Sequence, residues 1–411
     1  MAGVCFGTAR IDSVKGLYAT NLICGLAGST NETIVQMTIV DLFFIHQRSR
    51  MYATYSVAAT IGSFLVPLAA GAQAASQGWR WSYWTLAIVN TVIFFCFLIF
   101  FEESKYVENS FGQSVLEPQN DLEQTTPVSA SLKGEVTLDL SQPQPLRQTL
   151  SDTPNYTVNS YRQRMRLITP TRVNIWQLFY RPVEVLFCLP AVLFSAIQYG
   201  FILAWCAVFT SAQAIIMPYE PWNFNETQMG LLMLAPFIGL VIGLAVGGYV
   251  GDKMIVYFSK RNNGIYEPEM RLYAQIVPCI VSTAGFLVFG IYLSEYAHWA
   301  KCTVGTLIYG LGWGMGLNST TYAIDSYSGV IGEAFVSISF VRNIFSVILL
   351  FALEPWFAAE GLRNSFITMG VLCFVIQLLF IPMIIFGKRA RVITADRYNR
   401  MASAVKAYSR G

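Results

Sequence analysis

A carboxylate stands in the middle of the first long apolar stretch of this chain. Glu32 belongs to the polar run Ser29–Thr33 and directly follows Asn31. Ionisable side chains at bilayer depth usually face a cavity or a partner group. We therefore name Glu32 and Asn31 as candidate ligand contacts, with Glu32 either neutralising a cationic solute or exchanging a proton for it. The alternative is a structural hydrogen bond from Glu32 to a neighbouring helix.

Aromatic and amide side chains recur inside two later apolar stretches. The candidates for solute contact are Gln198, Tyr199, Trp205, Trp313, Asn318 and Tyr322. Aromatic faces attract organic cations by roughly 0.5–2 kcal/mol each, so a cage of such rings with one acid suits an amine. Aromatic residues within apolar helices also serve as packing or as interface anchors, and that alternative stays open for each of them.

A third group of functional candidates follows a glycine-rich helix face. Glycines recur every four residues from Gly239 to Gly251, a spacing that predicts close packing of two helices. Asp252, Lys253 and Arg261 come at the end of this stretch. A carboxylate there could hold neighbouring helices by ion pairs that break when two halves of the protein move. The alternative is a helix end with solvated charges.

Charged residues also flank the turn between two of the later apolar stretches. Asp325, Glu333 and Arg342 stand around it. They predict a charge-pair gate, with Asp325 and Arg342 as its candidate members.

Enzymatic chemistry has no support in the sequence. The eight cysteines are scattered singly and the two histidines, His46 and His298, are far apart, so neither a disulfide framework nor the spacing of metal ligands is present. No nucleophile–base pair is visible either. We expect no catalytic residues, no metal and no cofactor.

Nine stretches are long and apolar enough to position these residues within a bilayer, since a spanning helix needs ~20 apolar residues. They cover Thr20–Phe44, Tyr52–Ala75, Ser82–Phe101, Glu184–Thr210, Met229–Val250, Ala274–Leu293, Trp299–Ala323, Gly332–Leu353 and Asn364–Gly387. Hydrophobic residues make up 54% of the chain and charged residues only 12%, against roughly 25% charged in soluble domains. The sequence predicts an all-α membrane protein.

The basic residues predict how the chain crosses the membrane. Most of the 27 Lys and Arg residues fall on one side if the polar segment after the third stretch is cytoplasmic and the spans then alternate. Excess Lys and Arg mark the cytoplasmic side. We expect the linker and the C-terminal tail in the cytoplasm. The net charge of +3 is too small to indicate a nucleic-acid partner.

Four regions follow from this pattern. Residues 1–101 hold three spans, 102–181 form a linker, 182–387 hold six spans, and 388–411 form a basic tail. The linker is rich in Ser, Thr, Gln and Pro, a composition that favours disorder because it cannot bury enough apolar surface.

Several motifs together resemble the major facilitator superfamily. They are the loop Gly247–Lys253 with its trailing basic residues, Gly25–Glu32, Asp41–Arg48, Gly78–Trp81, Phe101–Tyr106, Tyr322–Tyr327 and Arg342-Asn343. The resemblance covers nearly the whole chain outside the linker. It is narrower to the fungal drug:proton antiporter branch, and within it to the HOL-type subgroup of histidinol, monovalent-cation and polyamine carriers. It implies a helical bundle of twelve spans in two halves, so about nine are represented and the family's first three helices are not.

The chain departs from the family pattern at other positions too. The family usually has an Arg, linked to proton coupling, where this chain has Asn21, which leaves coupling open. Gly62–Gly71, with Pro67, only loosely resembles the Gly/Pro-rich motif of antiporters.

The resemblance implies a secondary active transporter of a small organic solute (a drug, an amine or a cation), working by alternating access and coupled to protons in some relatives. Its expected partners are the solute, the lipid bilayer and protons, and its expected location is the plasma membrane. A transport-inactive membrane fragment or scaffold is the alternative.

Overall fold

The computed structural model describes residues 1–43, 45–101, 175–316 and 318–409. The first region, residues 1–101, contains α1 (Ala2–Ala9), α2 (Val14–Leu42), α3 (Ile45–Gln77) and α4 (Trp79–Phe100). The second region, residues 175–409, contains α6 (Ile175–Cys188), α7 (Pro190–Ile216), α8 (Glu226–Leu232), α9 (Leu234–Arg261), η1 (Pro268–Gln275), α10 (Ile276–Ser294), α11 (Trp299–Gly316), α12 (Asn318–Ser326), η2 (Ser328–Val330), α13 (Ile331–Gln377) and α14 (Phe380–Ser409). Throughout the described ranges, all regular structure is helical, which confirms the predicted all-α fold.

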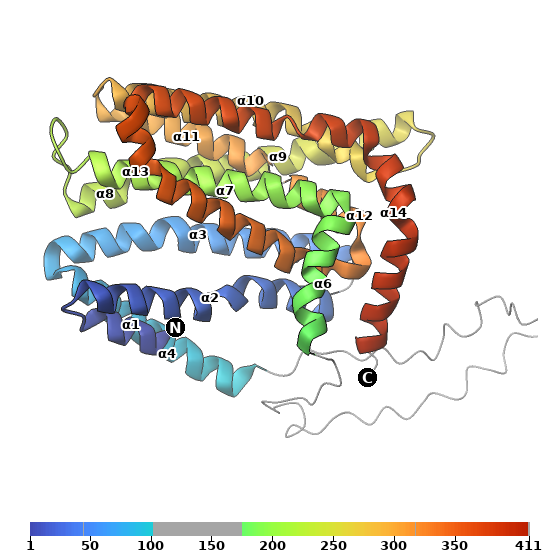
Figure 1. Ribbon diagram of the computed structural model, residues 1–411, viewed down its shortest axis with the longest axis horizontal. Helices are drawn as coiled ribbons and strands as arrows, with labels where there is room; N and C mark the ends of the chain where they lie inside the picture. The colour runs from blue at the N-terminus through green and yellow to red at the C-terminus, as the bar shows by residue number, and fades with distance from the viewer. Residues whose placement is uncertain (44, 102–174, 317, 410–411) are drawn as a thin grey trace, which may run out of the picture.

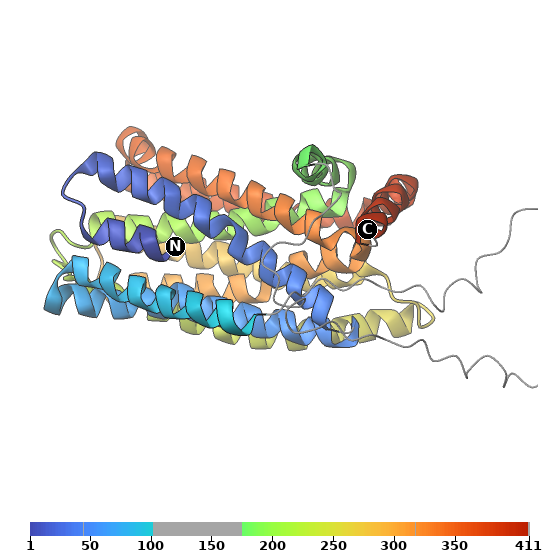
Figure 2. The ribbon, with the colours of Figure 1, turned by 90° about the horizontal axis from the view of Figure 1, so that it is seen from below.

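The predicted spans are helices. Within the described ranges, six segments are long and apolar enough to cross a membrane, and one of them, Ile331–Ala404, covers two predicted spans. The remaining two predicted spans coincide with α2 and with α11 followed by α12. The long helices run side by side in both views (Figures 1 and 2), as expected for a multi-pass bundle.

Specific residues set where these helices begin and bend. Ser13 caps α2 by accepting a hydrogen bond from the backbone N–H of Gly16 at 3.2 Å, because the first N–H groups of a helix lack partners within it. Gly78 (φ 89°) separates α3 from α4, and Gly361 (φ 76°) breaks α13 where one predicted span ends and the next begins. Only glycine adopts such positive φ values without strain.

One predicted span starts later than the sequence pattern indicated. The apolar run from Glu184 divides at Leu189, whose backbone is extended, and the spanning helix α7 begins at Pro190. The residue before a proline disfavours the helical conformation. The residues before this break form the separate helix α6, which crosses the other helices instead of continuing α7 (Figure 1).

The glycine face predicted on α9 packs against α11. A Cβ on Gly239 or Gly243 would collide with the backbone of α11, and one on Gly247 would lie 2.6 Å from Met315 Cα. Gly310 and Gly314 of α11 meet α9 in the same way. The predicted close packing is therefore confirmed, with small residues on both helices.

Burial differs sharply between the two regions. In the most apolar stretch of α7, 61% of the residues are buried, whereas in that of α4 only 6% are buried. The core of the second region is built on aromatic side chains, among them Trp205, Phe286, Tyr309 and Phe366. Phe100 on α4 is 79% exposed, and such an apolar surface suits a helix that faces lipid.

Candidate functional site

Two ion pairs tie the 3₁₀ helix η1 to α14 at one end of the bundle. Arg391 makes a two-pronged contact with Glu269, with Nε 2.8 Å from Oε1 and Nη2 2.6 Å from Oε2. Lys388 donates to Oε1 of Glu267 at 2.6 Å. The side chain of Glu269 is only 7% exposed, so its charge needs this partner. The Lys388 ammonium lowers the pKa of Glu267.

A third ion pair joins the end of α12 to the same segment. Nη2 of Arg271 lies 2.9 Å from Oδ2 of Asp325, and the Tyr266 hydroxyl donates to that oxygen at 2.7 Å. Burial and the hydrogen bond to Asp325 raise the pKa of Tyr266 to about 12. The phenol therefore remains a donor to Asp325 throughout the physiological pH range.

Four charged residues at this end were not among the candidates predicted from the sequence: Glu267, Glu269, Lys388 and Arg391. A signal existed, because the run Glu267–Glu269 lies shortly before one predicted span and the run Lys388–Arg391 directly follows the last. More than a hundred residues separate the two runs. Sequence spacing alone therefore could not pair these charges.

The predicted gating residues do not gather at one place. Asp325 is bonded to Arg271 as described above, whereas Arg342 lies about three turns into α13 and donates to Oδ1 of Asn343 at 3.3 Å. The Arg342 backbone lies close to Gly200, where a Cβ would be 3.2 Å from Arg342 Cα. This places Arg342 at the contact of α13 with α7, away from Asp325.

Asp252, Lys253 and Arg261 lie along the last turns of α9, and all three are exposed. The Lys253 ammonium lies over the Tyr249 ring, 4.4 Å from its centroid. Within the described part of the chain, Asp252 makes no ion pair. A carboxylate at this helix end is therefore available to a partner in another arrangement of the helices.

Gln198 is buried where α13 ends. Its Nε2 donates to the carbonyl oxygens of Ile376 at 2.9 Å and of Gln377 at 3.0 Å. The Gln377 Nε2 donates in turn to Ser282 Oγ at 2.5 Å. The Gln198 amide thus satisfies backbone acceptors at a helix end inside the bundle. The Oε1 atoms of Gln198 and Gln377 lack a partner among the described residues.

Three of the other candidates pack against neighbouring side chains. Trp205 is 1% exposed, with its ring centroid 5.2 Å from that of Phe286. Tyr322 is fully buried and meets Phe194 edge-on at 6.0 Å. Tyr199 is half-buried and packs against the buried cluster that contains Phe194 and Tyr322. These contacts fit the packing alternative at least as well as direct contact with a solute in this conformation.

Trp313 lies where the two regions of the chain meet. Its ring centroid is 5.9 Å from that of Phe64 on α3, and Phe64 also contacts Phe237 on α9 at 6.4 Å. The indole Nε1 of Trp313 is buried and lacks a hydrogen-bond partner among the described residues. A buried donor left unpaired costs ~1–3 kcal/mol, so water or a solute atom would be favourable beside it.

The remaining three candidates cannot be placed at the level of side chains. Asn31 and Glu32 belong to α2, and Asn318 is the first residue of α12, but their side chains lie outside the described residues. Their roles stay predictions from the sequence.

Two glycines allow α3 and α8 to touch at the opposite end of the bundle from the ion pairs. A Cβ on Gly71 would lie 2.5 Å from the carbonyl oxygen of Glu226, and one on Gly230 would lie 3.1 Å from Leu68 Cα. The Gly/Pro-rich segment of α3 thus closes against the second region of the chain at this end.

The chemistry that these groups can perform is binding and conformational change. In the described ranges, no three His, Cys, Asp or Glu side chains are grouped so that they could hold a metal ion. Ion pairs gather at one end and a backbone contact closes the other. Between them lies the Trp313 indole, whose N–H has no partner among the described residues.

Comparison with known proteins gives this geometry its context. The family model described as Major Facilitator Superfamily matches residues 1–350. An uncharacterized MFS-type transporter of Schizosaccharomyces pombe is 32% identical, over 95% of this chain and 71% of that protein. Protein HOL1 of Saccharomyces cerevisiae is 27% identical, over 92% of this chain and 71% of its own length. The efflux pump radE of Floropilus chiversii is 25% identical, over 91% of this chain and 63% of its own length.

These matches confirm the resemblance drawn from the motifs. They also agree with the helical bundle and its apolar spans, and they support transport of small solutes as the activity of this group. The chain belongs to the major facilitator superfamily and is a multi-pass membrane protein.

Proposed function

We propose that this protein is a secondary active carrier of a small organic amine, cation or drug-like molecule. The solute binds between the region before the linker and the six spans after it. Rocking of these two halves then opens the site alternately to each side of the membrane. Glu32 on α2 is the proposed counter-ion, and exchange of its proton for the solute is the proposed route of coupling.

The observation that carries this proposal is the position of Trp313. Its ring lies against Phe64 of α3, so it stands at the contact between the two halves, and its Nε1 has no partner in the described structure. The face of an indole attracts an organic cation, and its N–H can donate to a water or an acceptor on the solute. A side chain with both properties at this interface supports solute binding there.

The contact of Gly71 with α8 supports rocking as the transport step. Two helices that touch through their backbones can separate as rigid bodies, because no long side chains interlock between them. In the proposed orientation this end faces outside, so the structure corresponds to a state that is closed to the outside.

The helices α6 and α14 lie at the other end of the bundle from the turn between α3 and α4 (Figure 1). The basic residues near the tail support placing that end in the cytoplasm, with the plasma membrane as the proposed location. Cysteines introduced at Glu295 and at Arg389 would test this orientation. A membrane-impermeant thiol reagent should label the first in intact cells and the second only after permeabilisation.

Transport by the purified full chain in proteoliposomes tests the solute class. Uptake of radiolabelled spermidine is compared with uptake of sorbitol, a neutral solute of similar size. We expect Trp313→Leu to weaken spermidine affinity by roughly 2- to 30-fold, since a cation–π contact is worth ~0.5–2 kcal/mol. Trp299→Leu is the matched control, because Trp299 is 44% exposed at the opposite end of α11. Equal loss in both variants, or equal uptake of sorbitol, would reject the proposed site.

Coupling is tested in the same vesicles with an imposed pH gradient. We expect the gradient to drive spermidine flux in the wild type and to have no effect on Glu32→Gln, which cannot release a proton. Glu295→Gln, which changes an exposed carboxylate beyond the spans, should behave as the wild type. A gradient that drives the Glu32→Gln protein equally would show that this residue does not carry the proton.

A further inference from the structure

The helix α6 has three distinct faces, and only one of them is covered by the bundle. The first face packs inward and includes Val185 and Leu186, which are 2% and 6% exposed. The second carries Arg181, Glu184 and Cys188. The third is apolar and exposed.

The exposed apolar face of α6 is unusually aromatic. It comprises Trp176, Phe179, Tyr180, Val183 and Phe187. Trp176, Phe179 and Phe187 are each more than 70% exposed. A helix with one such face and one charged face is typical of segments that lie flat in the interface of a bilayer.

The direction of α6 agrees with that position. α6 and the last part of α14 cross the long helices in Figure 1, and both are seen nearly end-on in Figure 2. α14 lies further toward the end that carries the C-terminus. Because one face of α6 packs on the bundle and its charged face turns toward α14, the aromatic face is left to point toward the membrane interior.

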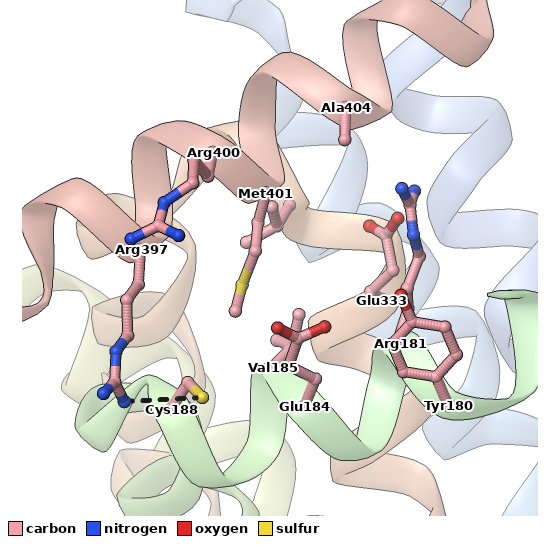
Figure 3. A pocket seen from close by; sticks show the side chains of 11 residues that line it. Tyr180, Arg181, Glu184, Val185, Cys188, Glu333, Arg397, Arg400, Met401 and Ala404 are labelled. Carbon is pink, nitrogen blue, oxygen red and sulfur yellow. Dashed lines mark hydrogen bonds between the residues drawn. The ribbon is translucent and has the colours of Figure 1, made fainter.

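A cleft of about 440 Å³ separates α6 from α14. Arg397 and Arg400 line it from α14, Arg181 and Glu184 from α6, and Glu333 from the start of α13 (Figure 3). Nη1 of Arg397 lies 3.9 Å from Sγ of Cys188, so this arginine reaches across the cleft to α6. The carboxylate of Glu184 points into the open space (Figure 3).

The charges in the cleft define what it can bind. Three arginines suit the oxygens of a phosphate and of a carboxylate, and two glutamates suit an ammonium group. The lining carries a single net positive charge. A phosphatidylserine headgroup has all three of these groups and a single net negative charge, and anionic lipids such as this one populate the cytoplasmic leaflet.

We propose that the cleft between α6 and α14 binds the headgroup of phosphatidylserine from the cytoplasmic leaflet, while the aromatic face of α6 rests among its acyl chains. The arginines contact the phosphate and the carboxylate, and Glu184 contacts the ammonium. This proposal uses the orientation proposed above, but it does not depend on the solute or on transport.

Binding of short-chain lipids to the purified full-length chain in detergent tests the proposal. We expect dioctanoyl phosphatidylserine to bind, and dioctanoyl phosphatidylglycerol to bind several-fold more weakly because it lacks the amine. Glycerophosphoserine, the same headgroup without acyl chains, and inorganic phosphate should each bind at least roughly tenfold more weakly. These two probes distinguish a lipid site from a site for soluble anions.

Variants assign the binding to the cleft. We expect Arg397→Gln together with Arg400→Gln to weaken phosphatidylserine binding by roughly tenfold or more, since charge-assisted hydrogen bonds are lost. Arg389→Gln is the matched control, because Arg389 is exposed on the same helix but does not line the cleft. Glu184→Gln should reduce the preference for phosphatidylserine over phosphatidylglycerol. Phe179→Ser with Phe187→Ser should weaken binding of the lipid but not of glycerophosphoserine.

Five outcomes would overturn the proposal. The first four are absence of phosphatidylserine binding, equal loss in Arg389→Gln, equal affinity for glycerophosphoserine, and equal affinity for phosphatidylglycerol. Melting curves of every variant show whether it is folded. A correctly folded double arginine variant that binds the lipid as the wild type does would be equally decisive against the cleft.

Discussion

Glu269 and Arg391 form a two-pronged ion pair that fastens η1 to α14, the last helix of the bundle. The carboxylate is almost fully buried, and the guanidinium is about a quarter exposed. Removing one partner of a buried pair leaves an uncompensated charge. The neighbouring pair of Glu267 and Lys388 has the same separation of 2.6 Å but a Lys388 side chain that is 66% exposed. The two pairs therefore allow the stability contributed by a buried ion pair to be compared with that contributed by an exposed one.

We expect Glu269→Gln to destabilise the protein by an amount toward the lower end of ~3–5 kcal/mol, because Arg391 is partly solvated. Lys388→Gln should cost at most ~1 kcal/mol, as is usual for exposed pairs. Thermal unfolding of the purified proteins in one detergent measures both. Similar melting temperatures for the two variants would contradict the difference in burial.

The pair of Glu267 and Lys388 should contribute stability that depends on pH. Lys388 lowers the pKa of Glu267, so the folded state favours the ionised carboxylate. Stability of this kind is present above the unfolded pKa of about 4.3 and is lost as the pH falls. The melting temperatures of the wild type and Lys388→Gln should therefore differ at neutral pH and converge as the pH falls below about 4.3, through the lowered pKa of Glu267 in the folded state. Lys301→Gln, which removes an ammonium over the Tyr292 ring, should show a difference that does not change with pH.

Enlarging Gly71 should prevent close contact of α3 with α8. A Cβ would lie 2.5 Å from the carbonyl oxygen of Glu226, so Gly71→Val must push the helices apart. We expect easier labelling of a cysteine placed at Leu68 by an impermeant reagent, and a lower rate of transport. Gly62→Val is the control on the same helix, since a Cβ at Gly62 meets nothing within 4 Å. Unchanged labelling in Gly71→Val would show that this contact does not close the outer end.

Asp252→Asn should slow transport without destabilising the protein. The carboxylate is exposed and makes no ion pair within the described ranges, so its loss removes no contact from this conformation. If Asp252 pairs in the opposite state of the transport cycle, the maximal rate should fall while substrate affinity changes little. Rates and affinities in proteoliposomes, with protein abundance measured in parallel, separate these effects. An equal loss of binding and rate would argue against a role in rocking.

Periodicity and composition were sufficient to predict the helices, and the resemblance of several motifs was sufficient to predict the family. A bilayer offers no hydrogen-bond partner for backbone polar groups, so the chain crosses it as long apolar helices. Each such stretch can therefore be recognised in the sequence without knowledge of its neighbours. The glycine spacing from Gly239 to Gly251 likewise reports a packed face, because helical geometry places every fourth residue on one side. The break before Pro190 was not predicted, because the apolar run continues through it.

The pairing of charges and the use of each polar side chain were decided by tertiary structure. The sequence suggested a gate at Asp325 and Arg342, but the fold brings Arg271 and Tyr266 to Asp325. It also pairs Glu269 with Arg391 across more than a hundred residues. Local sequence records which residues can ionise. Which charges meet depends on how the helices pack, because attraction between two charges falls with distance and each buried charge must find its partner in space.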